Sequence, residues 1–232
     1  MEREFCDISE NQKGELRVGI AYTRGRAILP GILEAFAGVY PNVRVILTEE
    51  RNHTLQNLLH EGRVDLAIAR FQKPLPGIEV QPFYTEDTVL LVSRQLLQTC
   101  GIDLAAHRAE IERGDLRALR GCPFVSGSAE DITGSLERDA FRRAGFVPEV
   151  RAESSNVETL LELCARGVGA CFCPENLARL LLAAQPHGRL EMLRMPDTMA
   201  YPISFGYAKR AYPWSVLADF IRIAHAQYPP KA

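Results

Sequence analysis

The residues best suited to binding chemistry are hydroxyl and guanidinium side chains that follow short apolar runs. Thr23, Arg24, Arg70, Ser126 and Ser155 all stand at such positions. Arginine donates charge-assisted hydrogen bonds to carboxylates and phosphates, and the first turn of a helix adds unpaired backbone N–H groups. The pattern predicts a site for a small anion and shows no catalytic triad. The predicted ligand contacts are Tyr22, Thr23, Arg24, Arg70, Phe71, Ser126, Gly127, Ser128, Ser155, Asn156 and Cys173.

Each of these residues also has a purely structural interpretation, and the sequence leaves both open. The run from Ser155 to Glu158 matches the Ser-x-x-Glu capping box, in which the serine caps a helix. Thr23 stands where it could organise a helix start. Arg24, Arg26 and Arg70 could be ordinary solvated charges.

The stretch from Gly62 to Phe71 shows how such a site would be positioned. Gly62 can end the preceding helix in a left-handed conformation, and residues 64–69 are typical of a strand that is buried on both faces. Arg70 and Phe71 then follow its carboxyl end, where open α/β sheets bind ligands.

The rest of the chain alternates between strand-like and helix-like periodicity, which predicts α/β architecture with parallel strands. The region 95–120 has only a thin apolar stripe and is interpreted as one helix plus a loop. A helix is predicted at 27–40, and Pro30 falls in its first turn, where proline is tolerated. Strands are predicted at 14–21, 43–48, 64–69, 78–83, 88–93, 123–126, 149–153, 170–173, 190–195 and 201–207, and further helices at 53–61, 131–144, 157–166, 176–183 and 214–226.

Composition indicates a folded protein and excludes several classes. Of the 232 residues, 47% are hydrophobic and 24% are charged, which argues against disorder. A formal net charge of −2 lacks the basic surplus of a self-sufficient nucleic-acid binder. No apolar run is long enough for a membrane helix, and the first residues lack a secretion signal. Six irregularly spaced cysteines are typical of reduced thiols, so a cytoplasmic protein is expected.

We predict no cofactor and no metal site. Cys171 and Cys173 are expected to point to opposite faces of a strand, which would prevent them from sharing a metal. His53 and His60 are the only two histidines on one predicted helix, and their seven-residue spacing does not form a compact site.

Taken in order, five segments resemble the effector-binding domain of LysR-type transcriptional regulators. That resemblance implies two Rossmann-like lobes of the type 2 periplasmic-binding-protein class, joined by two crossing strands, with a small effector between them. The chemistry of the loops favours a carboxylate as that effector. It implies lobe one at 14–88 plus 205–232, lobe two at 89–204, and a linker remnant at 1–13. The segments are 14–20, 29–43 (Leu-Pro to Tyr-Pro-Asn-Val), 61–68 (Glu-Gly-Arg-Val-Asp-Leu-Ala-Ile), 86–92 and 157–174.

The implied function is effector sensing in transcriptional control, without catalysis. The resemblance implies a homodimer of this domain and a tetramer of the full-length regulator. Contact with DNA would require an N-terminal winged helix-turn-helix that we do not find in this chain, and no membrane partner is expected. Two alternatives share the scaffold: a solute-binding protein, which would need an export signal, and a small enzyme, which would need a convergent nucleophile and base.

Overall fold

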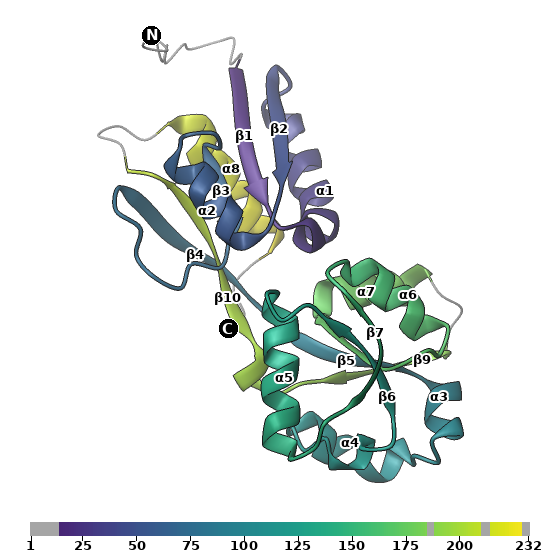
Figure 1. Ribbon diagram of the computed structural model, residues 1–232. Coiled ribbons are helices and arrows are strands. Elements are labelled where there is room, and N and C mark those ends of the chain that lie inside the picture. The colour runs from purple at the N-terminus through teal and green to yellow at the C-terminus, as the bar shows by residue number, and fades with distance from the viewer. Residues whose placement is uncertain (1–13, 185–187, 210–213, 229–232) are drawn as a thin grey trace. The chain divides into compact units, whose positions relative to one another are not determined.

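The computed structural model describes residues 14–184, 188–209 and 214–228 and divides into two compact units (Figure 1). Unit 1 comprises the described residues up to Thr85 and from Pro202 onward, and unit 2 comprises Glu86–Tyr201. The chain passes between the units at 85/86 and 201/202, three residues before each predicted boundary. The predicted linker remnant, 1–13, lies outside the described residues.

Unit 1 is organised by a five-stranded sheet in the order β2-β1-β3-β10-β4. Strand β1 pairs in parallel with β2 and β3, while β10 runs antiparallel to the central strand, β3. The carboxyl ends of β1, β2 and β3 therefore lie at one edge of the sheet. The strands are β1 (Gly14–Ile20), β2 (Val43–Glu49), β3 (Leu66–Ala69), β4 (Ile78–Glu86) and β10 (Tyr201–Ala208).

Helices cover this sheet because β3 is apolar on both faces, and all four of its residues are buried. Ala67 and Ala69 pack with the leucines of α2 (Asn52–His60). Two further helices, α1 (Tyr22–Val39) and α8 (Ser215–Gln227), pack on each other through Phe36 and Phe220, whose ring centroids are 5.3 Å apart.

The first helix begins earlier than its apolar period predicts. The predicted helix start at Ala27 is wrong, because α1 begins at Tyr22, directly after β1. Pro30 is consequently the ninth residue of the helix and not part of its first turn. Proline deprives the carbonyl four residues earlier of a partner. That residue, Arg26, is exposed like Pro30, so water can satisfy the carbonyl.

Unit 2 contains a three-stranded sheet, β8-β5-β9, and a parallel pair, β6-β7. An isolated parallel bridge between Phe124 and Ala170 joins the two sets. As in unit 1, parallel strands bring their carboxyl ends to one edge. The strands are β5 (Thr88–Ser93), β6 (Pro123–Gly127), β7 (Glu149–Ser154), β8 (Cys171–Pro174) and β9 (Leu190–Arg194).

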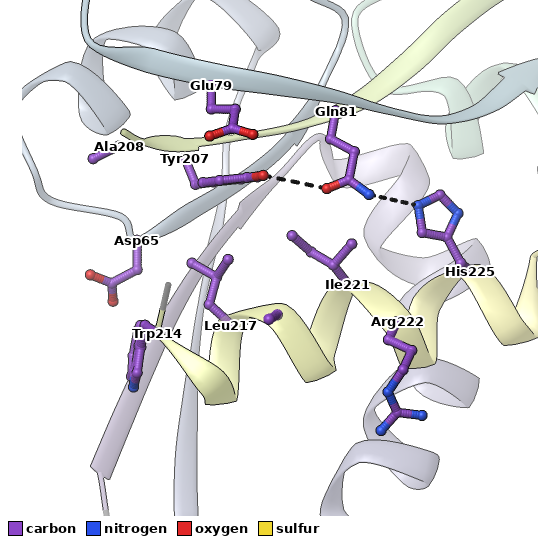
Figure 2. Close-up of a pocket in the computed structure, with 11 residues that line it drawn as sticks. Asp65, Glu79, Gln81, Tyr207, Ala208, Trp214, Leu217, Ile221, Arg222 and His225 are labelled. Atoms are coloured by element: carbon purple, nitrogen blue, oxygen red, sulfur yellow. Dashed lines mark hydrogen bonds between the residues drawn. The ribbon is translucent and has the colours of Figure 1, made fainter. Parts of the chain in front are cut away.

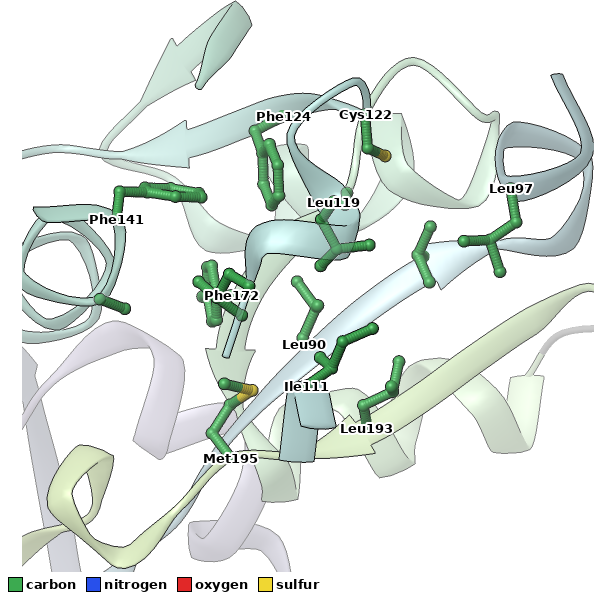
Figure 3. Close-up of a cluster of buried hydrophobic side chains, with 14 of the residues drawn as sticks. Leu90, Leu97, Ile111, Leu119, Cys122, Phe124, Phe141, Phe172, Leu193 and Met195 are labelled. Carbon is green, nitrogen blue, oxygen red and sulfur yellow. The ribbon is translucent and has the colours of Figure 1, made fainter. Parts of the chain in front are cut away.

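The helices of unit 2 enclose one core on each face of these strands. Alternate residues of β5 divide between the two cores: Leu90 joins Phe124 and Phe172 (Figure 3), whereas Val89 and Leu91 face the other way. The helices are α3 (Arg94–Thr99), α4 (Leu104–Glu112), α5 (Ile132–Ala144), α6 (Val157–Ala165) and α7 (Glu175–Ala184), with short 3₁₀ turns at Arg117–Leu119 and Asp197–Met199.

The region 95–120 is more ordered than its thin apolar stripe predicts. The expectation of one helix plus a loop is wrong, since α3 and α4 are separate helices with side-chain caps from Ser93 and Asp103. Gly101, with φ +65°, lies between them. Ile111, Leu116 and Leu119 are fully buried, so the few apolar residues present do anchor the segment. None of the helices in the described part of the chain combines the length and the apolar character that a bilayer crossing requires.

The cysteines of β8 share one face of the strand. The expected opposite orientation of Cys171 and Cys173 is wrong, because side chains two residues apart on a strand lie on the same side. Both belong to one apolar cluster together with Cys164. Burial holds these thiols among apolar side chains, and the pKa of Cys171 lies well above its usual value.

Candidate functional site

The carboxyl edge of the unit 1 sheet gathers the five ligand contacts predicted in that unit. Ile20, the last residue of β1, pairs with Ile68 near the end of β3. The segment 22–24 therefore begins α1 close to the position where the segment 70–71 leaves β3. The sequence prediction placed both segments at this edge, and the structure places them there.

The five residues differ in what they expose. Tyr22 is 57% exposed, and Thr23 and Arg70 are partly exposed. Arg24 is only 4% exposed, so it serves the interior of the unit and not its surface. Phe71 packs its ring against Gly206 of β10, where a Cβ would overlap it. Tyr22, Thr23 and Arg70 are thus the polar surface groups that a ligand can reach, and Phe71 is also partly exposed.

Arg70 is held in place by α2, which sequence reasoning did not associate with the site. Its backbone N–H donates to Asn52 Oδ1 over 3.0 Å, and its carbonyl accepts from Gln56 Nε2 over 2.9 Å. These two amides fix the chain where it leaves β3. Only the three- to four-residue spacing of polar side chains along α2 could have suggested this role.

Glu49, at the end of β2, is a second residue that sequence reasoning missed. A Cβ on Gly25 would overlap the Glu49 carboxylate, so the two lie in close contact at the first turn of α1. An acid near a helix N-terminus is favourable. An anionic ligand at this edge therefore meets a resident carboxylate, and Arg70 is the partly exposed arginine that follows β3 there.

The carboxyl edge of the β6-β7 pair gathers the serine-rich loops of unit 2. Gly127 of β6 lies opposite Ser154 of β7 in the parallel register. The segments 126–128 and 155–156 consequently leave the sheet side by side. Each leads into a helix, α5 and α6 respectively.

Ser126 is committed to an internal partner. Its hydroxyl donates to Glu137 Oε1 over 2.5 Å, and the Gly127 N–H lies 3.4 Å from Glu137 Oε2. Glu137 is 2% exposed, and burial raises the pKa of its carboxyl from 4.5 to about 7 against the opposing hydrogen bond from Ser126. This acid was not predicted. Its only signal is a glutamate on the otherwise small and apolar face of α5.

The N-terminus of α6 is capped by Asn156 and not by Ser155. Asn156 Oδ1 accepts from the Glu158 N–H over 2.9 Å, and Ser154 Oγ accepts from the Asn156 N–H over 3.1 Å. The capping-box interpretation of Ser155 is therefore wrong by one residue. Ser155 is exposed and its hydroxyl has no partner within the described residues, so it remains available to a ligand.

This assignment predicts a difference between two neighbouring substitutions. Asn156→Ala removes the cap and should lower the free energy of unfolding by about 1 kcal/mol, whereas Ser155→Ala should change it by less than about 0.5 kcal/mol. Urea denaturation followed by circular dichroism measures both. Equal losses would contradict the assignment, and a larger loss in Ser155→Ala would restore the capping box.

The remaining predicted contacts, Ser128 and Cys173, differ in their exposure to solvent. Ser128 is partly exposed and its Oγ accepts from the Glu130 N–H over 3.4 Å. Cys173 is fully buried in the apolar cluster of β8, away from any ligand surface. Among the described residues, no group of three or more His, Cys, Asp or Glu side chains is placed to hold a metal.

A family model matches almost the whole chain. The model for the LysR substrate binding domain covers residues 9–229. That span includes both units and both carboxyl edges. The fold class predicted from the sequence, α/β with two lobes of the type 2 periplasmic-binding-protein class, is confirmed.

Individual relatives agree with the family match. An uncharacterised HTH-type transcriptional regulator of Bacillus subtilis, YcgK, is 26% identical over 76% of this chain and 57% of its own length. The structure of HinK, a LysR family transcriptional regulator from Pseudomonas aeruginosa, aligns with a TM-score of 0.71 at 18% identity, over 96% of this chain and 72% of that one. The effector binding domain of QuiR in complex with shikimate aligns with a TM-score of 0.67 at 18% identity, over 92% and 96%.

This chain spans little more than half the length of the first curated relatives. The relatives are transcriptional regulators, which are not enzymes.

Proposed function

Because the chain belongs to the family of LysR substrate binding domains, we propose that it senses a small carboxylate effector for a LysR-type transcriptional regulator. The observation that carries the proposal is the gathering of Thr23 and Arg70 at one carboxyl edge. In open α/β sheets this edge is where ligands bind. The finer proposal is that the loops of unit 2, through Ser128 and Ser155, contact the same effector.

The chemistry of the reachable groups supports a carboxylate. Arg70 supplies a positive charge, and Thr23 and Ser155 supply hydroxyl donors. A hydrogen bond between a charged group and a shielded carboxylate contributes about 1.5–3 kcal/mol. The fold itself accommodates an acid of this kind, as the complex of QuiR with shikimate shows for that protein.

Regulators of this family bind DNA and small-molecule effectors and are oligomeric. We propose the same for the cytoplasmic regulator that uses this domain, with DNA contacted through a winged helix-turn-helix. Exposed apolar side chains on outer strands, Leu47 on β2 and Val150 on β7, support a homodimer that pairs unit 1 of one subunit with unit 2 of its mate. An effector would act by favouring one arrangement of subunits over another.

Isothermal titration calorimetry with a panel of small mono- and dicarboxylates tests the effector site. For the acid that binds best, Arg70→Ala should weaken affinity about 10- to 100-fold. Thr23→Ala should weaken it by a smaller factor. If Ser155 contacts the same ligand, Thr23→Ala and Ser155→Ala should show non-additive losses in a double-mutant cycle.

Arg63→Ala is the matched control. Arg63 is an exposed arginine seven residues earlier, before β3 and at the opposite end of that strand from Arg70. Arg63→Ala changes the net charge by the same amount as Arg70→Ala, and it should leave the affinity for the acid unchanged. Binding that survives the combined Thr23→Ala and Arg70→Ala substitutions would overturn the proposed site. Equal losses of affinity in Arg70→Ala and Arg63→Ala would also overturn it, because they would show that the arginines act only through long-range charge.

A further inference from the structure

Unit 1 contains a pocket at the opposite end of β3 from Arg70. It opens between β4 and β10 on one side and α8 on the other (Figure 2). Tyr207, which lines it, pairs with Leu66 at the amino end of β3. Its volume of 580 Å³ is within the range of small-molecule sites. The pocket is therefore separate from the proposed effector site.

One wall of the pocket is apolar and aromatic. Leu217 and Ile221 project from α8, Trp214 directly precedes this helix, and the ring of Tyr207 faces them from β10 (Figure 2). Trp214, Leu217 and Tyr207 are only partly buried. This wall can receive the apolar part of a ligand without any rearrangement of the core.

The other wall carries a chain of polar side chains. The Tyr207 hydroxyl donates to Gln81 Oε1 over 3.4 Å, and Gln81 Nε2 lies 3.5 Å from His225 Nε2. Both distances are at the long limit for hydrogen bonds. These groups therefore hold one another weakly and can turn toward a bound molecule.

The charges around the pocket leave one carboxylate in excess. Asp65 is held by Arg17 through a 2.7 Å ion pair, and Arg222 is held by Asp219 at 2.9 Å. These pairs cancel. Glu79 forms no ion pair with any residue in the described part of the chain, and its carboxylate points toward Tyr207 (Figure 2).

Glu79 affects the pKa of its neighbour Tyr207. The pKa of Tyr207 is raised, first by burial and then by the negative charge of Glu79. The carboxylate and the aromatic ring are thus direct neighbours. A carboxylate beside a tyrosine ring favours a cation, because aromatic faces also attract positive charge.

We propose that this pocket binds a small organic amine that carries an apolar or aromatic group. Its ammonium contacts Glu79 and the face of Tyr207. Its apolar part packs on Trp214, Leu217 and Ile221, and Gln81 accepts a further hydrogen bond. The domain then recognises a cation at one end of β3 and an acid at the other.

The chain supplies its own reporter for this site. Trp214 is the single tryptophan of the 232 residues, so its fluorescence reports on this pocket alone. Three probes of similar shape separate charge from apolar contact: phenethylamine, phenethyl alcohol and hydrocinnamate. Phenethylamine should change the emission of Trp214 in a saturable way, the alcohol should bind about 10-fold more weakly, and hydrocinnamate should not bind over the same range.

Two glutamate variants complete the experiment. Glu79→Gln should lower the affinity for phenethylamine about 10-fold, to that of the alcohol. Glu34→Gln, which removes an exposed carboxylate from α1 of the same unit, should leave the affinity unchanged. Because Glu79 is exposed, its substitution should leave the urea midpoint unaltered, which excludes unfolding as the cause.

Several outcomes would overturn the proposal. They are equal responses to all three probes, no response to any, or undiminished amine binding by Glu79→Gln. Arg70→Ala should leave the amine response intact, so a failure of the effector site and a failure of this pocket give different results.

Discussion

Replacing Gly169 by alanine is expected to lower the free energy of unfolding of unit 2 by about 3 kcal/mol. Gly169 precedes β8, and its Cα lies against the backbone of β6. A Cβ there would lie 2.6 Å from the carbonyl carbon of Phe124 and 2.8 Å from the Val125 nitrogen. Because both atoms belong to the main chain, no side-chain rotation can relieve the overlap.

The strands must separate instead, and two hydrogen bonds between them are at risk. The Val125 N–H donates to the Ala170 carbonyl over 2.9 Å, and the Ala170 N–H donates to the Pro123 carbonyl over 2.8 Å. Urea denaturation followed by circular dichroism measures the loss.

Gly121→Ala is the matched control, because nothing lies within 4 Å of its Cβ position and its φ is not positive. That substitution should change stability by less than about 0.5 kcal/mol. Equal effects at the two glycines would contradict the close-packing argument.

Gly167, two residues earlier, is a glycine for a different reason. Its φ is +76°, the left-handed conformation that commonly follows the end of a helix, here α6. Gly169 has no positive φ and is required by the neighbouring strand. A local pattern indicates a helix stop, but it contains no information about which distant backbone approaches.

Buried strands were the most predictable part of the fold. β3 lies within the predicted run 64–69 because continuous apolar residues between a glycine and a charged exit have few other stable arrangements. Start points of helices were less predictable. The early start of α1 depends on Gly25, which admits the Glu49 carboxylate, and that contact joins residues 24 positions apart.

The candidate site was predictable in its location and only partly in its chemistry. The carboxyl-edge rule located the segments 22–24 and 70–71 from order alone. It could not show that Arg24 is buried or that Phe71 packs on Gly206, because both depend on tertiary neighbours. Likewise, the sequence shows that Ser126 has a hydroxyl that can donate a hydrogen bond, but only the structure shows that Glu137 accepts this bond.

Glu137→Gln is expected to remove a pH dependence of stability between pH 4.5 and about 7. The pKa of Glu137 is raised by burial from 4.5 to about 7 in the folded protein. Within this window the folded state retains a proton that the unfolded state has released, so stability falls as pH rises. At about 1.4 kcal/mol per pH unit, the fall attributable to this one group is about 3 kcal/mol.

Glutamine reproduces the neutral form of the carboxyl and can accept the hydrogen bond from Ser126, so it removes the titration with little loss of contact. The variant should match the wild type near pH 4.5 and exceed its stability above pH 7. Urea midpoints at closely spaced pH values measure both curves. Glu162→Gln, an exposed glutamate of α6 paired with Arg166 at 2.7 Å, is the control and should run parallel to the wild type. A Glu137→Gln curve that keeps the wild-type slope would show that Glu137 is ionised throughout the window, and the buried Ser126–Glu137 pair would then require a compensating cation.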